Sequence, residues 1–132
     1  MNCIRETGAG RGIGLATARA FLAAGWRVIA LDRQFDEVIA GERLDFDLRN
    51  LAGIPALVAS IGEIDTLVNN AGVLYCDPPD AIPAEHKREI LAVNLEAPAE
   101  LIECLAPQMK ARRNGRVVSV APVSAFTGHP DL

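Results

Sequence analysis

Short aliphatic runs alternate with longer segments of helical periodicity along this chain. Short runs of residues that favour strands predict β-strands at residues 26–31, 44–46, 64–68 and 116–121. Apolar positions at helical spacing predict one helix over residues 12–24, ended by Gly25. A second helix is predicted over residues 51–60, with Asn50 as its N-cap and Gly62 after it.

A longer helical segment follows the strand at residues 64–68. Pro83 stands in its first turn, and apolar positions continue at helical spacing as far as Leu101. Pro98 is expected to kink or interrupt this helix, because proline has no backbone N–H. Strands that alternate with helices imply parallel βαβ units. The sequence therefore predicts an α/β fold, a doubly wound parallel sheet (Rossmann-like), as a single domain over residues 1–132.

The first strand does not fit this pattern. In a doubly wound sheet the first strand is central and buried on both faces, so it should be apolar. Here it covers residues 1–6 and ends in Arg5 and Glu6. Burying these two charges without partners would cost several kcal/mol. We expect that the natural start of this strand has been lost or altered, and the sequence assigns it no functional role.

Composition and charge limit the classes of partner. Half of the residues are apolar but only 5% are aromatic, so the core must be built from Ala, Val, Leu and Ile. The formal net charge of −4 argues against a nucleic-acid partner. Arg112, Arg113 and Arg116 lie near a predicted helix end, where the helix dipole favours cations. No apolar run approaches the roughly 20 residues that span a bilayer, which predicts no membrane partner.

The cysteines and histidines indicate neither disulfides nor a metal site. Cys3, Cys76 and Cys104 are odd in number, widely spaced and without a CxxC pair, as expected for reduced thiols in a cytoplasmic protein. His86 and His129 lie far apart without ligand spacing around them, so no metal site is predicted.

A glycine-rich loop, TGAGRGIG at residues 7–14, joins the first strand to the first helix. Glycines let the backbone approach a pyrophosphate closely, and the following helix N-terminus offers N–H groups to it. A glycine turn that merely joins the two elements is the alternative. The GxGxxG pattern fails because Ile13 stands where the third glycine should be, whereas Gly8, Gly12 and Gly14 give TGxxxGxG.

This spacing resembles the cofactor loop of the short-chain dehydrogenase/reductase family. Three later segments are similar to motifs of that family, in the right order: FDL at residues 46–48, NNAG at 69–72 and AVNL at 92–95. In the family, the first holds the adenine ring and the second stabilises the sheet beside the cofactor. The third carries a catalytic asparagine, here Asn94, which holds a proton-relay water through its backbone.

The resemblance, which extends from Thr7 to about Gly128, implies a set of cofactor-binding residues. They are Gly8, Arg11, Gly12, Ile13, Gly14, Asp32, Arg33, Asp47, Leu48, Asn70, Ala71, Gly72 and Val93. Asp32 ends the second strand, where a carboxylate can accept hydrogen bonds from ribose hydroxyls and repel a 2′-phosphate. NAD is therefore expected over NADP, although Arg11 or Arg33 could meet a phosphate.

The resemblance fails at the catalytic serine and at the acid–base pair. The family's serine position is Pro122 here, and Ser124, two residues further, is the replacement candidate. The family's Tyr-x-x-x-Lys is missing, because the single tyrosine, Tyr75, is followed four residues later by Pro79. By the family's spacing this motif would begin beyond Leu132, so the domain is expected to be truncated at its C-terminal side.

Truncation would also expose the strand at residues 116–121 as an aliphatic edge and leave the fold incomplete. The family's second helix is expected to be reduced to residues 35–40. Association into a homo-oligomer is compatible with the resemblance, which does not specify it.

Three functions follow as hypotheses. In the first, the parent protein is an oxidoreductase that moves a hydride between NAD(H) and a small-molecule alcohol or ketone, and this chain alone is inactive. In the second, the chain is a non-catalytic dinucleotide-binding fragment or pseudoenzyme. In the third, it is a flavodoxin-like binding protein, which leaves the NNAG segment and Asn94 without explanation.

Overall fold

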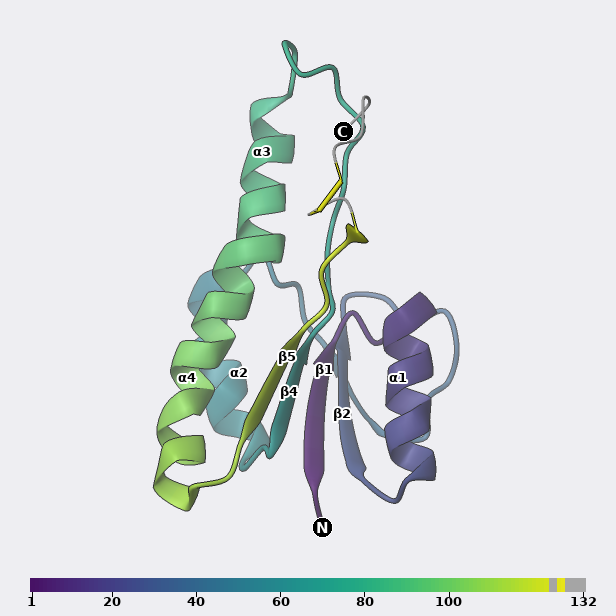
Figure 1. Cartoon of the computed structure of the whole chain (residues 1–132), viewed down its shortest axis with the longest axis vertical. Helices are drawn as coiled ribbons and strands as arrows, with labels where there is room; N and C mark the ends of the chain where they lie inside the picture. Colours follow the sequence, from purple (N-terminus) through teal and green to yellow (C-terminus); the bar gives the residue numbers. More distant parts are fainter. Residues whose placement is uncertain (124–125, 128–132) are drawn as a thin grey trace.

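A computed structural model describes residues 1–123 and 126–127, and its centre is a five-stranded parallel sheet (Figure 1). The strands are β1 (Cys3–Thr7), β2 (Arg27–Asp32), β3 (Glu42–Asp45), β4 (Thr66–Asn69) and β5 (Arg116–Ser119). The helical segments are α1 (Gly12–Ala23), η1 (Leu51–Gly53), α2 (Ile54–Ile61), α3 (Ala84–Leu91), η2 (Ala92–Glu96) and α4 (Ala97–Arg112).

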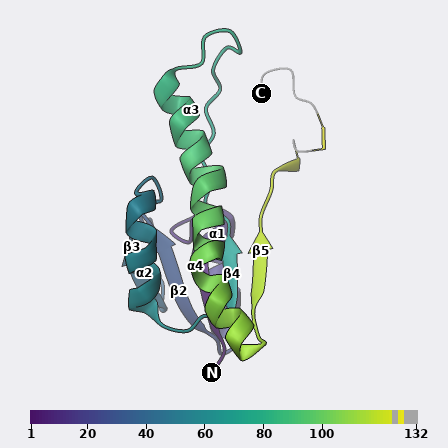
Figure 2. The same ribbon diagram turned by 90° about the vertical axis from the view of Figure 1, so that its left-hand side faces the viewer.

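Helices cover both faces of the sheet, as the alternating pattern predicted. Helix α1 lies on one side, whereas α2 and α4 lie on the other (Figures 1 and 2). The strand order is β3-β2-β1-β4-β5, so the direction of winding reverses between β1 and β4. The predicted α/β, doubly wound parallel sheet is thereby confirmed. In such sheets, ligands bind outside the carboxyl ends of the strands at the point of reversal.

The predicted helix ends are confirmed where a glycine or an asparagine signals them. Gly25 has φ +79° and donates its N–H to the Leu22 carbonyl, closing the end of α1. Asn50 Oδ1 accepts from the Gly53 N–H at 3.2 Å, the predicted cap. This bond closes a tight first turn. The single helix predicted over residues 51–60 is therefore observed as a 3₁₀ segment, η1, followed by α2.

The helix predicted over residues 35–40 is wrong, because this stretch forms bends without helical turns. Six residues are too few to nucleate a helix without strong support. Residues 35–40 are held instead by a hydrogen bond to the glycine loop and by burial of one side chain. The Asp36 N–H donates to the Gly10 carbonyl at 3.2 Å, and Ile39 is buried in the cluster beneath α1.

The predicted interruption near Pro98 takes the form of a π-helical segment. Helices α3 and α4 run on as one rod through η2 (Figure 1). Pro98 cannot donate to the Asn94 carbonyl four residues earlier. The wider turn of η2, in which the Ala97 N–H bonds the Ala92 carbonyl, absorbs this missing hydrogen bond without ending the helix.

Two charged side chains are buried in the central strand β1. Arg5 and Glu6 are both 0% exposed, and their side-chain polar atoms have no hydrogen-bond partner among the described residues. Arg5 shares its face with Cys3, toward α2 and α4, and Glu6 shares the opposite face with Ile4. Burial lowers the Arg5 pKa to about 10 and raises the Glu6 pKa to about 8. The sequence predicted that Arg5 and Glu6 would not suit a buried central strand, and the fold does bury them without partners in the described part of the chain.

Strand β5 is the outermost strand of the described sheet, and all four of its residues are exposed. It is two residues shorter than predicted at its carboxyl end. Val117 and Val118 remain nearly half exposed. An aliphatic strand in this state is a liability for edge-to-edge association.

Candidate functional site

A cavity of about 280 Å³ opens where the winding of the sheet reverses. Its walls are the segments that follow β1, β2, β3 and β4, together with η2. The lining residues are Gly8, Arg11, Ile13, Leu31, Asp32, Arg33, Phe46, Asp47, Leu48, Asn70, Ala71, Gly72, Val73 and Val93. Apart from Gly12 and Gly14, every residue predicted to hold the cofactor lies in this lining.

Leu31, Phe46 and Val73 line the cavity without having been predicted. Each is a direct neighbour of a predicted residue along the chain. Because they are apolar, the sequence does not distinguish them from core residues. Phe46 belongs to the FDL segment that also contains Asp47.

Gly14 does not line the cavity, but it allows the glycine loop to pack closely. A Cβ atom on Gly14 would lie 2.0 Å from the Gly8 carbonyl oxygen. On Gly10 it would lie 2.0 Å from the Gln34 carbonyl oxygen. Gly8 itself has φ +69°, a backbone region that favours glycine. The glycines thus let the loop fold back on itself against the sheet.

Asp32 anchors the glycine loop to the end of β2. Its Oδ2 accepts from the Gly10 N–H at 2.9 Å, and its Oδ1 accepts from the backbone N–H groups of Arg33 at 2.7 Å and Gln34 at 3.3 Å. These bonds hold the carboxylate at the edge of the cavity, where the sequence placed it.

The NNAG segment is tied to β1 through Thr7. The Thr7 hydroxyl accepts from the backbone N–H groups of Asn70 and Ala71, each at 3.0 Å, and donates to the Val68 carbonyl at 3.4 Å. The Asn70 amide donates to the carbonyls of Thr7 and Gly8 at 3.3 Å. A side-chain clamp therefore joins the ends of β1 and β4 beneath the cavity.

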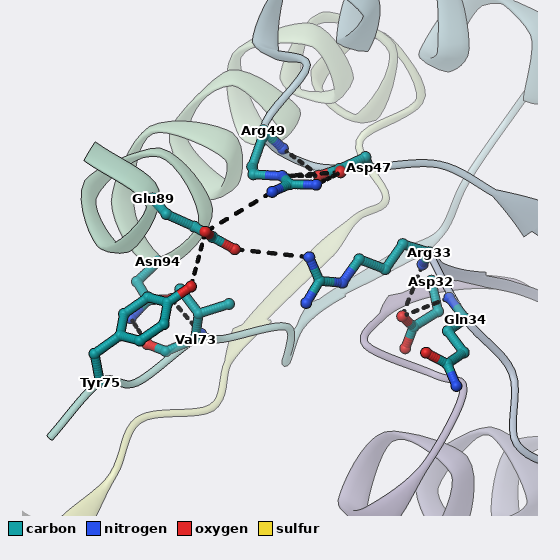
Figure 3. A network of polar contacts seen from close by, with 9 residues as sticks. All are labelled: Asp32, Arg33, Gln34, Asp47, Arg49, Val73, Tyr75, Glu89 and Asn94. Atoms are coloured by element: carbon teal, nitrogen blue, oxygen red, sulfur yellow. Dashed lines mark hydrogen bonds and ion pairs between the residues drawn. The ribbon is translucent and has the colours of Figure 1, made fainter. Parts of the chain in front are cut away.

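Asn94 holds the chain that leaves the NNAG segment. Its Oδ1 accepts from the Val73 N–H and its Nδ2 donates to the Val73 carbonyl, both at 2.8 Å (Figure 3). Asn94 does not itself line the cavity, but it fixes Val73, which does. Since Pro98 has no N–H to donate, the Asn94 backbone carbonyl lacks its usual α-helical partner.

A charged network borders the same cavity. Glu89 of α3 accepts a hydrogen bond from the Tyr75 hydroxyl at 2.8 Å and lies 3.6 Å from the Arg33 guanidinium and 3.8 Å from that of Arg49 (Figure 3). Arg49 also donates to both carboxylate oxygens of Asp47, at 3.0 and 2.9 Å through Nε. This bonding lowers the pKa of Asp47, and the hydrogen bond to Glu89 raises the pKa of Tyr75.

Sequence reasoning missed Glu89 and Arg49 because neither belongs to a motif. Tyr75 was considered only as part of an acid–base pair, and its hydroxyl is engaged by Glu89. Ser124, the replacement candidate for the catalytic serine, lies outside the described residues. None of the helices in the described part of the chain is long and apolar enough to cross a membrane.

Residues 2–132 match the sequence model of the short chain dehydrogenase family. The chain belongs to this family. The match covers all four segments that suggested the resemblance, from the glycine loop to Asn94. The family resemblance drawn from the sequence is thereby confirmed.

Curated dehydrogenases are similar to this chain over most of its length. The 2,3-dihydro-2,3-dihydroxybenzoate dehydrogenase of Escherichia coli (strain K12) is 36% identical over 126 residues, which are 92% of this chain and 51% of that protein. The galactitol 2-dehydrogenase of Agrobacterium fabrum is 34% identical over 135 residues, 92% of this chain and 53% of that protein. The chain spans about half the length of the curated relatives it matches.

Solved structures of the family superpose closely. A 4-hydroxyisoleucine dehydrogenase complexed with NADH has a TM-score of 0.92 at 28% identity, covering 99% of this chain and 60% of that one. A gluconate 5-dehydrogenase from Burkholderia cenocepacia J2315, in complex with NADP and tartrate, has a TM-score of 0.87 at 30% identity, covering 99% and 57%. Proteins similar to this chain thus hold either nicotinamide dinucleotide.

Proposed function

We propose that this chain is the dinucleotide-binding part of an oxidoreductase that moves a hydride between NAD(H) and a small-molecule alcohol or ketone. The observation that carries the proposal is the cavity at the reversal of the sheet, bordered by the glycine loop and Asp32. The backbone of the glycine loop fits a dinucleotide there, because the loop can adopt this conformation only when its glycines carry no side chains. A Cβ on Gly8 would lie 2.8 Å from the Ala71 Cα.

Each wall of the cavity suits one part of the cofactor. The glycine loop and the N-terminus of α1 suit the pyrophosphate, since backbone N–H groups and the helix dipole both favour an anion. Asp32 suits the adenosine ribose, and Asp47 and Leu48 suit the adenine ring. When bound, the nicotinamide supplies or accepts the hydride.

Asn94 is proposed to serve the proton path of this reaction. Its side chain holds Val73 through one accepted and one donated hydrogen bond, and the group proposed for the proton path is the backbone carbonyl that Pro98 leaves without an α-helical donor. A carbonyl in that state can accept from a water molecule. Since Tyr75 is bound to Glu89, we propose that the acid–base step needs residues outside these 132 and that this chain alone is inactive.

The cofactor assignment is tested by replacing Asp32 with alanine. Loss of the hydrogen bond to Gly10 is expected to weaken the binding of both dinucleotides. Loss of the ribose contacts should weaken the binding of NAD alone, and loss of the charge should relieve the repulsion of a 2′-phosphate. We expect NADH affinity to fall about tenfold or more, with a smaller fall for NADPH. The measurement is fluorescence titration with each dinucleotide.

The exposed Asp36→Ala is the matched control and should leave both affinities unchanged. Equal weakening of NADH and NADPH by Asp32→Ala would contradict the NAD preference. Wild-type protein that binds neither dinucleotide, or that carries flavin absorbance, would contradict the proposed function itself.

A non-catalytic dinucleotide-binding module is the second candidate, and Pro122 favours it. Proline at the family's serine position has no hydroxyl to polarise a carbonyl. This candidate predicts dinucleotide binding without turnover. NADH oxidation by this chain with a panel of ketones tests this candidate: turnover that depends on ketone would rule out the binding module and would also contradict the inactivity of this chain alone.

A further inference from the structure

Glu89 connects three segments through polar contacts beside the cavity (Figure 3). It lies on α3, while Arg33 follows β2, Arg49 follows β3, and Tyr75 lies in the segment after β4. The Glu89 side chain is only 16% exposed. Of these four residues, only Arg33 lines the cavity.

Charges around this end of the cavity are nearly balanced within the protein. Three carboxylates, those of Asp32, Asp47 and Glu89, accompany two guanidinium groups, those of Arg33 and Arg49. Arg49 is held by Asp47 and approached by Glu89. Arg33 has Glu89 as its ion-pair partner in the described part of the chain. The arginine that directly follows Asp32 in the chain and lines the cavity is therefore already engaged.

We propose that Glu89 is a positioning residue for cofactor specificity, which holds the Arg33 guanidinium and so keeps it from a 2′-phosphate. This inference rests on the proposed dinucleotide site. A 2′-phosphate beside Asp32 needs a cation to offset the carboxylate, and Arg33 is the residue placed to provide it. Glu89 competes for that cation, so Asp32 and Glu89 both act against NADP.

The contacts also indicate how strong this effect is. The Arg33–Glu89 distance of 3.6 Å and the 51% exposure of the Arg33 side chain describe a solvent-screened pair. Its removal should therefore change affinity severalfold and not by orders of magnitude. The hydrogen bond from the Tyr75 hydroxyl, at 2.8 Å, opposes rotation of the Glu89 carboxylate away from Arg33.

The test is Glu89→Gln in the intact protein, read out as the dissociation constants of NADH and NADPH by fluorescence titration. Glutamine keeps the shape, the helix propensity and an acceptor for Tyr75, but not the charge. We expect NADPH to bind about fivefold more tightly, with NADH affinity within about twofold of wild type. Glu89→Ala must move the ratio of the two constants in the same direction.

Two further variants make the outcome specific. Glu85→Gln removes an exposed carboxylate of the same helix and should leave the ratio unchanged. Arg33→Ala combined with Glu89→Gln should abolish the gain in NADPH affinity, because the guanidinium that would contact the 2′-phosphate is then missing.

An unchanged ratio in Glu89→Gln overturns the inference, since a purely structural role would alter both affinities equally. A gain that persists without Arg33 also overturns it and would assign the phosphate to Arg11, the other arginine of the lining. Wild-type protein that binds neither dinucleotide overturns the proposed function, an outcome distinct from an unchanged ratio.

Discussion

Replacing Arg5 with leucine and Glu6 with valine is expected to raise the free energy of unfolding by on the order of 5 kcal/mol. Both side chains are 0% exposed in the central strand, and their polar atoms have no partner among the described residues. A buried charge without a partner costs far more than an apolar side chain of similar size. Leucine and valine also suit a strand that is buried on both faces.

Glu6 makes the stability of the wild-type chain depend on pH. Burial raises its pKa from 4.5 to about 8, so between these values the folded chain keeps a proton that the unfolded chain has released. Stability therefore falls as the pH rises across this window, by up to about 1.4 kcal/mol per pH unit. Glu6→Val should remove this slope. The lowered pKa of Arg5, about 10, acts only at higher pH.

Urea unfolding at pH 5.5, 7 and 8 measures both effects. The matched control is Glu42→Val with Arg43→Leu, the same exchange on the edge strand β3, where both residues are exposed. Their ion pairs with Arg27 and Asp45 lie at the surface, so the control should change stability by less than about 1 kcal/mol. A double variant of β1 that is no more stable than wild type would contradict a cost of burying these two polar side chains without partners.

Replacing Gly14 with alanine is expected to weaken NADH binding by about 100-fold or more. The new Cβ would lie 2.0 Å from the Gly8 carbonyl oxygen and 2.7 Å from the Asn70 amide nitrogen. Backbone cannot yield as a flexible side chain can, so the glycine loop must move away from the NNAG segment. A displacement of about 1 Å is enough to break hydrogen bonds to a charged pyrophosphate, each of which contributes roughly 1.5–3 kcal/mol.

Gly62→Ala is the control for glycine replacement as such. Gly62 has φ +73°, and a Cβ at this position would meet no atom within 4 Å. Alanine there should therefore cost on the order of 1–3 kcal/mol of stability and leave NADH affinity unchanged. Fluorescence titration and thermal unfolding of both variants separate binding from folding. Gly14→Ala protein that binds NADH within a few-fold of wild type would show that the loop tolerates the methyl group.

The fold and the place of the cavity could be predicted from local features of the sequence. Aliphatic runs between helical segments predict a parallel sheet, because strands buried on both faces are typically apolar. The TGxxxGxG spacing marks the turn from β1 into α1, and the NNAG segment marks the end of β4. Both signals are local, since each reflects how the backbone must bend or bond within a few residues.

Several details needed the tertiary structure. The helix expected at residues 35–40 is absent because contacts with the Gly10 carbonyl and the core outweigh a weak local preference. The sequence recognised Gly14 as part of the loop, but only the fold shows that it packs against Gly8 instead of facing the cavity.

The amino-acid sequence was sufficient to predict the family, the sheet and most of the residues that line the cavity, because these depend on backbone geometry that leaves local patterns. The surroundings of Arg33 could be known only from the folded chain. Its partner Glu89 lies 56 positions away along the chain, and Tyr75 and Arg49 join from two further segments. Ion pairs between distant segments have neither period nor spacing, so they arise only when the fold brings the side chains together.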